Sequence, residues 1–155
     1  MRARRCLLLA ATALPGVGPP VAATPPPEAL LPSLRWEHRL VVYQVDNGET
    51  AKAVRRAAAD HEEVLAERRI LFLPLHPGKT DRADPPPLHR SLSGAERDEV
   101  RERWEIAREG TVFLLVGLDG TVKDRRESLP DWEAWAERID RMPMRRRELR
   151  EGEGA

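Results

Sequence analysis

LVVYQV, residues 40–45, is an unbroken run of aliphatic, β-branched and aromatic residues with a single glutamine. Such a run is typical of a strand that is buried on both faces. DNG at 46–48 follows and offers a helix cap. Residues 49–68 carry apolar side chains at helical spacing, and we expect ILFL at 70–73 to form a second buried strand. This order predicts a right-handed crossover between two parallel strands, with the first strand central in the sheet.

The second half of the chain predicts another helix followed by a hairpin. SGAE at 93–96 has the pattern of a capping box, and we expect the helix that begins there to stop at Gly110. TVFLLVG at 111–117 is the strongest strand of the chain, and DG at 119–120 is typical of a tight hairpin turn. The returning strand, 121–126, is heavily charged, which indicates a sheet edge.

Three tryptophans lie on the apolar faces of predicted helices. Trp104 shares a face with Ala107, and Trp132 shares one with Trp135 in a last helix that we expect to end before Pro143. Aromatic side chains at this spacing predict core packing rather than a ligand platform.

The resulting order, β-α-β-α-β-β-α, predicts an α/β fold of the thioredoxin-like type, with a four-stranded mixed sheet flanked by helices. A ferredoxin-like sandwich is the main alternative, although its order places the helices differently. We expect the domain to occupy residues 34–144, between a proline-rich linker at 24–33 and a charged tail at 145–155.

Residues 1–23 have the pattern of a signal peptide, with three early arginines, a short apolar stretch and small residues at the end. A retained anchor is the alternative. Cleavage would leave 23 basic residues against 26 acidic ones, a net charge of −3, which argues against nucleic acid as a partner. We therefore expect a periplasmic or secreted protein with no transmembrane span after processing.

Cys6 is the only cysteine of the chain and lies in this leader. Thioredoxin-type catalysis places a cysteine at the N-terminus of the first helix of the crossover, where the helix dipole lowers its pKa. The matching positions are Asp46, Asn47 and Gly48, none of which is a redox nucleophile. Thiol exchange and thiol peroxidase activity are therefore excluded for the mature chain, unless a partner supplies the sulfur.

Three segments resemble one family. They are LRWEHR at 34–39, GLDGTVK at 117–123 and IDRMPMR at 139–145, and together they resemble the secreted family catalogued as domain of unknown function 4174. The resemblance covers about residues 30–150 and implies a thioredoxin- or peroxiredoxin-like fold and export, with relatives in vertebrate extracellular matrix proteins. It implies no activity. Leu118 stands where the family more often has a lysine, so a role for that lysine does not transfer.

Metal or acid–base chemistry has only weak candidates, namely His76, Asp81, Asp84 and His89 in the irregular segment 76–92. Their spacing matches no known zinc motif, so we expect solvated loop histidines instead. The sequence thus predicts no catalytic residue and no cofactor.

The preferred hypothesis is a non-catalytic binding module for an envelope or extracellular protein. We expect its contact surface at segment 76–92 and at the rim formed by Asp46, Asn47 and Gly48. A cysteine-independent, metal-assisted envelope enzyme is the alternative.

Overall fold

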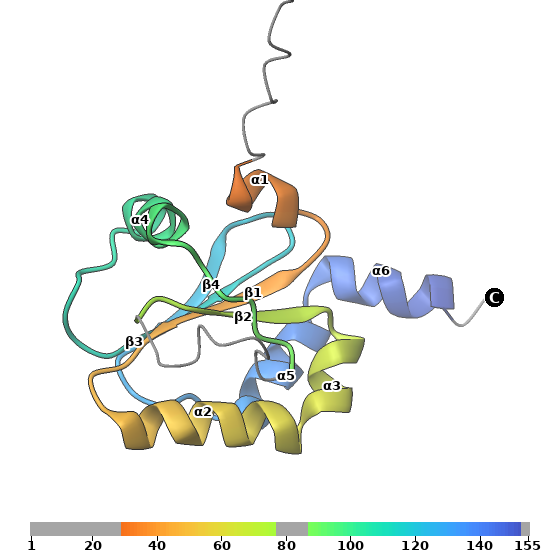
Figure 1. Cartoon of the computed structure of the whole chain (residues 1–155). Coiled ribbons are helices and arrows are strands. Elements are labelled where there is room, and N and C mark those ends of the chain that lie inside the picture. Colours follow the sequence, from red (N-terminus) through yellow and green to blue (C-terminus); the bar gives the residue numbers. More distant parts are fainter. Residues whose placement is uncertain (1–28, 77–86, 153–155) are drawn as a thin grey trace, which may run out of the picture.

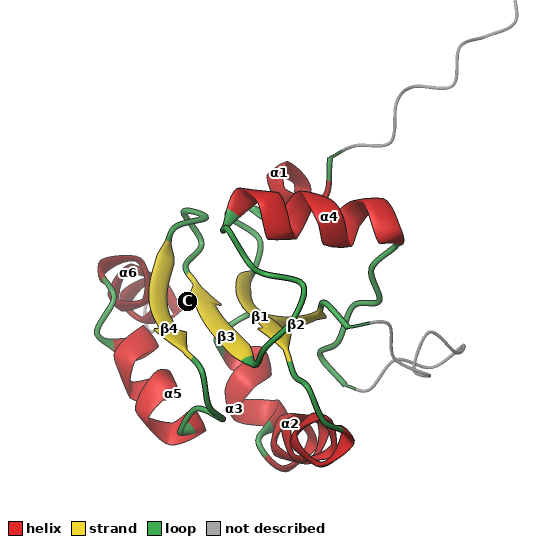
Figure 2. Ribbon diagram, turned by 90° about the vertical axis from the view of Figure 1, so that its left-hand side faces the viewer, coloured by secondary structure: helices red, strands yellow, loops and turns green. Residues whose placement is uncertain are grey.

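The computed structural model describes residues 29–76 and 87–152, which form one four-stranded sheet with helices on both faces (Figures 1 and 2). The strand order is β2-β1-β3-β4. The first strand runs parallel to β2 and antiparallel to β3, and β3 runs antiparallel to β4. The predicted mixed sheet with a central first strand is confirmed. The strands are β1 (Arg39–Gln44), β2 (Ile70–Pro74), β3 (Val112–Val116) and β4 (Val122–Arg126).

Burial explains the strand order. Every residue of β1 and β3 is buried, so these two strands can only lie in the middle of the sheet. No residue of the charged strand β4 is fully buried, and this strand is an edge, as predicted. The other edge strand is β2, and its outer side forms a single parallel bridge between Phe72 and His89. There the Phe72 amide donates a hydrogen bond to the Leu88 carbonyl at 2.7 Å.

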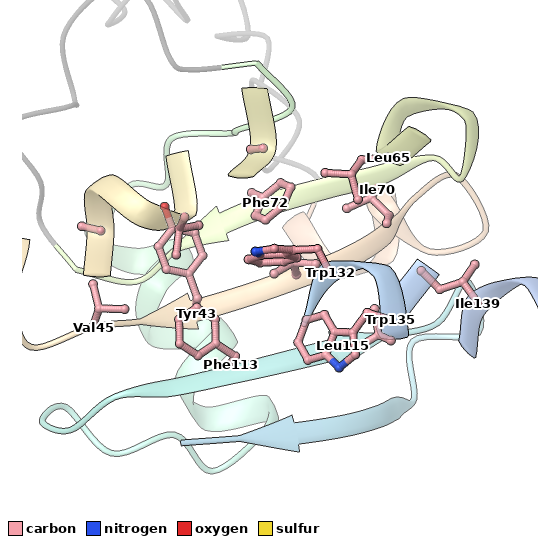
Figure 3. Packing of buried hydrophobic residues seen from close by; sticks show 14 residues of the cluster. Tyr43, Val45, Leu65, Ile70, Phe72, Phe113, Leu115, Trp132, Trp135 and Ile139 are labelled. Carbon is pink, nitrogen blue, oxygen red and sulfur yellow. The ribbon is translucent and has the colours of Figure 1, made fainter. Parts of the chain in front are cut away.

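The helices divide between the two faces of the sheet (Figure 2). One face is covered by α2, α3, α5 and α6, and the other by α1 and α4. Aromatic rings dominate the first of these cores, where Trp132 lies between the sheet and the helices beside Phe72, with 5.5 Å between ring centroids (Figure 3). The helices are α1 (Leu30–Leu34), α2 (Gly48–Asp60), α3 (Glu62–Glu67), α4 (Gly94–Arg103), α5 (Trp132–Asp140) and α6 (Pro143–Gly152).

Two predicted helices end earlier than expected. The helix predicted over 49–68 is interrupted at His61, which ends α2 and precedes α3. The capping box at Ser93 is confirmed, but α4 stops at Arg103 rather than at Gly110. Glu105 adopts a left-handed backbone, φ 50°, which ends the helix and turns Ile106 into the core. Ala107, expected in the core, is exposed.

The folded part is longer than predicted at both ends. Residues 30–33, assigned to the linker, belong to α1, whose Leu30 and Leu34 are buried beneath the sheet's second face. The tail expected at 145–155 forms most of α6, and Arg145 is only 5% exposed. The predicted leader at 1–23 lies outside the described residues. Within 29–76 and 87–152, no helix is long and apolar enough to cross a membrane.

Candidate functional site

Asp46 and Asn47 lie between β1 and α2, and Gly48 is the first residue of α2, where a thioredoxin-like fold places its reactive cysteine. The sequence forms a helix start here because Asn47 supplies the cap. Its side-chain oxygen accepts a hydrogen bond from the Thr50 amide at 2.8 Å. Asn47 therefore completes the helix, which is a structural role.

The Asp46 carboxylate ties this rim to the loop before β3. It accepts hydrogen bonds from the Gly110 amide at 2.9 Å and from the Thr111 hydroxyl at 3.3 Å. Gly110 has φ 93°, a conformation that glycine adopts without the steric cost of a side chain. The carboxylate thus holds two loops together.

A buried polar network supports the same loop from below. Gln44 donates to the Gly110 carbonyl at 3.0 Å and accepts from the Arg101 guanidinium at 2.7 Å. Arg101 also donates to the Leu75 carbonyl at 2.9 Å, and burial lowers the pKa of its guanidinium. The side chains of Asp46, Gln44 and Arg101 thus form hydrogen bonds that stabilise the loops at this end of the sheet, and none of them is a sulfur nucleophile.

The histidine candidates come together around one ring. His89 is 8% exposed and stacks on Phe72 with 4.8 Å between centroids, and both His89 and His76 lie against Tyr43, at 6.0 and 5.5 Å. The expectation of solvated loop histidines is wrong for His89, because its ring completes the core over the edge of β2. Its Nδ1 donates to the Pro87 carbonyl at 2.8 Å, and burial lowers the pKa of His89 and raises that of Tyr43.

The metal hypothesis stays a prediction. Asp81 and Asp84 lie outside the described residues. Within 29–76 and 87–152, no three side chains of the metal-ligating kinds are grouped closely enough to hold an ion.

Sequence reasoning missed a groove at the opposite end of the sheet. Trp36 is 50% exposed there and has a left-handed backbone, φ 71°, which is rare for a bulky residue. Its amide donates to the Leu118 carbonyl at 2.8 Å, and the Arg35 guanidinium lies 5.1 Å from the centre of its ring. These contacts hold an aromatic side chain at the surface.

The Trp36 groove has a volume of about 680 Å³. Its walls come from α1, α4 and the hairpin between β3 and β4, and they include Leu31, Trp104 and Glu102. A tryptophan outside any helical or strand periodicity was the one sequence signal that could have indicated it.

The segments that carried the family resemblance meet at this end. The Trp36 segment hydrogen-bonds to the hairpin through Leu118. Arg39, at the end of the same segment, pairs with Glu148 of α6 at 3.2 Å. The last segment contributes Arg145, whose guanidinium donates to the Glu67 carboxylate and backbone of α3.

A family model described as "Domain of unknown function (DUF4174)" matches residues 30–148 of this chain. No curated protein matches this chain.

Solved structures with a similar fold have little sequence in common with the chain. The reduced 2-Cys peroxiredoxin of Plasmodium vivax has a TM-score of 0.52 and 11% identity, over 77% of this chain and 84% of that one. Thioredoxin peroxidase I of Plasmodium yoelii gives 0.49 and 11%, over 71% and 75%, and copper-bound ScoI of Arabidopsis thaliana gives 0.44 and 11%, over 70% and 85%. The peroxiredoxin likeness confirms the thioredoxin-like fold.

Proposed function

We propose that this chain, which belongs to the DUF4174 family, is a non-catalytic thioredoxin-like module that binds another protein of the cell envelope or the extracellular space. The observation that carries the proposal is the Trp36 groove. Large exposed aromatic rings beside an apolar hollow are typical of protein contact sites. The fold's usual chemistry has no sulfur here, since the sole cysteine, Cys6, precedes the domain.

The partner best suited to this groove is an extended protein segment with an apolar side chain. Leu31, Leu34 and the Trp104 ring supply apolar walls, whereas the charged lining residues have both signs. Such a lining favours an uncharged insertion, and tryptophan is among the residues that contribute most to binding at protein interfaces. We propose export, with the periplasm or the cell exterior as the location, on the pattern of residues 1–23.

Site-specific photocrosslinking in the organism's own cells tests this proposal. A photoreactive residue at Glu102, on the groove, is compared with one at Glu63, which is exposed on α3 across the sheet. We expect a discrete protein adduct from position 102 only, and its loss with Trp36→Asn, because asparagine tolerates the left-handed backbone. Absence of an adduct at 102, or an adduct that survives Trp36→Asn, contradicts the proposal.

Elemental analysis of the purified protein addresses the rival enzyme. Stoichiometric zinc or iron that disappears with His76→Ala would favour the metal-assisted enzyme over a pure binding module.

A further inference from the structure

A second hollow lies on the other side of the β3–β4 hairpin from the Trp36 groove. It has a volume of about 460 Å³, within the range of small-molecule sites. The hairpin forms one wall and the start of α6, Met142 to Met144, forms another. We propose that this hollow, the anion pocket, binds a small organic molecule through a phosphate or sulfate group.

The charges around the anion pocket favour an anion. Its lining includes four cationic side chains and one carboxylate, that of Asp119. The cations are Arg39, Lys123, Arg138 and Arg141. Each cation is also paired with a carboxylate, and three of these carboxylates lie outside the pocket lining, so a bound anion would compete with them for the same donors. The carboxylates are Glu148, Asp119, Asp124 and Glu137.

Two of these cations are held weakly. Arg141 is paired with Glu137 at 2.9 Å along the exposed surface of α5, and Arg138 lies 3.7 Å from Asp124. The Arg141–Glu137 pair is exposed, and exposed ion pairs contribute little to stability, so the Arg141 guanidinium can turn toward a ligand at small cost. Guanidinium groups bind phosphate and sulfate oxygens in a bidentate manner.

The start of α6 offers backbone donors to the same ligand. The first bond across its start runs from the Arg146 amide to the Met142 carbonyl at 3.0 Å. The amides of Met144 and Arg145 have no acceptor among the described residues. Free amides and the positive end of the helix dipole favour an anion.

Arg39 supplies an independent sign of a missing acceptor. Its side chain is 1% exposed, with its two terminal nitrogens donating to Glu148 and to the Arg68 carbonyl. Its Nε is buried and has no hydrogen-bond partner within the described residues. A buried donor without an acceptor is costly. Arg39 lines the pocket, so a ligand oxygen that reaches this nitrogen would remove that cost.

Gly117 makes room for the lysine that faces the pocket. A side-chain carbon at this position would lie 2.5 Å from Cε of Lys123 and 2.8 Å from an oxygen of Asp119. Lys123 therefore lies across the glycine, where Asp119 accepts its hydrogen bond at 2.8 Å. Met142, which precedes α6, and Met144 within it provide an apolar wall for the organic part of the ligand.

Binding is tested by nuclear magnetic resonance titration of the folded chain with inorganic phosphate, inorganic sulfate and glycerol 3-phosphate, at constant ionic strength maintained with chloride. We expect phosphate or sulfate to shift the amide signals of Met144 and Arg145, and glycerol 3-phosphate to bind more tightly than inorganic phosphate. Shifts spread evenly over the surface, or none at α6, would overturn the assignment.

Matched variants separate a site from general charge attraction. Lys123→Gln and Arg141→Gln should each weaken binding by at least about threefold, as loss of a partly exposed charged contact does. Arg147→Gln removes the same charge from an exposed position of α6 outside the pocket and should change nothing. Equal weakening by all three would refute the pocket. The Trp36 groove has its own variants, so failure of one proposal leaves the other standing.

Discussion

Replacing Arg145 should destabilise the whole domain, although its sequence context is a highly charged terminal segment. Its guanidinium donates to the Glu67 carboxylate at 2.5 Å and to the Glu67 carbonyl at 3.2 Å, and it lies 3.4 Å from a carboxylate oxygen of Asp140. Burial alone would lower the pKa of Arg145, but the hydrogen bonds that its guanidinium donates to Glu67 and Asp140 outweigh this effect and raise the pKa. The charged form is therefore the one that the fold stabilises.

The magnitude follows from these contacts after a discount for exposure. Breaking a fully buried ion pair costs about 3–5 kcal/mol, but the Glu67 side chain is 59% exposed, so solvent screens part of this interaction. We expect Arg145→Met, which keeps an unbranched side chain of similar reach, to lower the free energy of unfolding by about 2 kcal/mol. Arg145→Ala should cost about 3 kcal/mol, because it also removes the buried stem.

Urea denaturation followed by tryptophan fluorescence measures both values, since Trp132 and Trp135 lie in the core. Arg147→Ala is the control, an exposed arginine on the same helix that should change stability by less than about 0.5 kcal/mol. If Arg145→Ala also stays within about 0.5 kcal/mol of the parent, α6 is not part of the cooperative unit and the reasoning is refuted.

Three further predictions concern single side chains. Trp36→Gly should leave the free energy of unfolding within about 1 kcal/mol of the parent, because relief of the left-handed strain offsets the lost ring contacts; a larger loss in urea denaturation would count against strain at this position. Asp46→Ala should cost about 1 kcal/mol and speed hydrogen exchange at the Gly110 amide, and unchanged exchange would show that the clamp is unimportant. His89 has a folded pKa below its unfolded value near 6.5, so its contribution to stability is present above that value and is lost as pH falls through the window beneath it. His89→Phe should flatten the stability profile in that window, and an unchanged slope between parent and variant would contradict the assignment.

The sheet was predictable from sequence because its signals are local. Unbroken apolar runs identify β1 and β3 as central, and the charges of β4 identify it as an edge. The order of these elements then placed Asp46 at the fold's usual reactive position. Both the strand order and the position of Asp46 follow from residues that are neighbours in the sequence.

The remaining features depend on contacts between distant residues. The sequence of α6 is mostly charged. Its packing rests on the Arg39 guanidinium of β1, which donates to the Glu148 carboxylate, and on the Arg145 guanidinium, which donates to the Glu67 carbonyl of α3. The exposure and left-handed turn of Trp36 leave no periodic pattern, so the groove beside it could not be found from spacing. His89 was misjudged because its stacking on Phe72 requires a bridge to the sheet edge.

The pairing of Arg39 with Glu148 couples the central strand of the sheet to the last described helix. The two residues are 109 positions apart, and the first of them begins the central strand. A nascent chain that has emerged only as far as the hairpin would have to bury a guanidinium with no counter-ion, which is prohibitively unfavourable. Burial of Arg39 is therefore coupled to the docking of α6, and we expect a chain shortened before α6 to lose hydrogen-exchange protection at the start of β1.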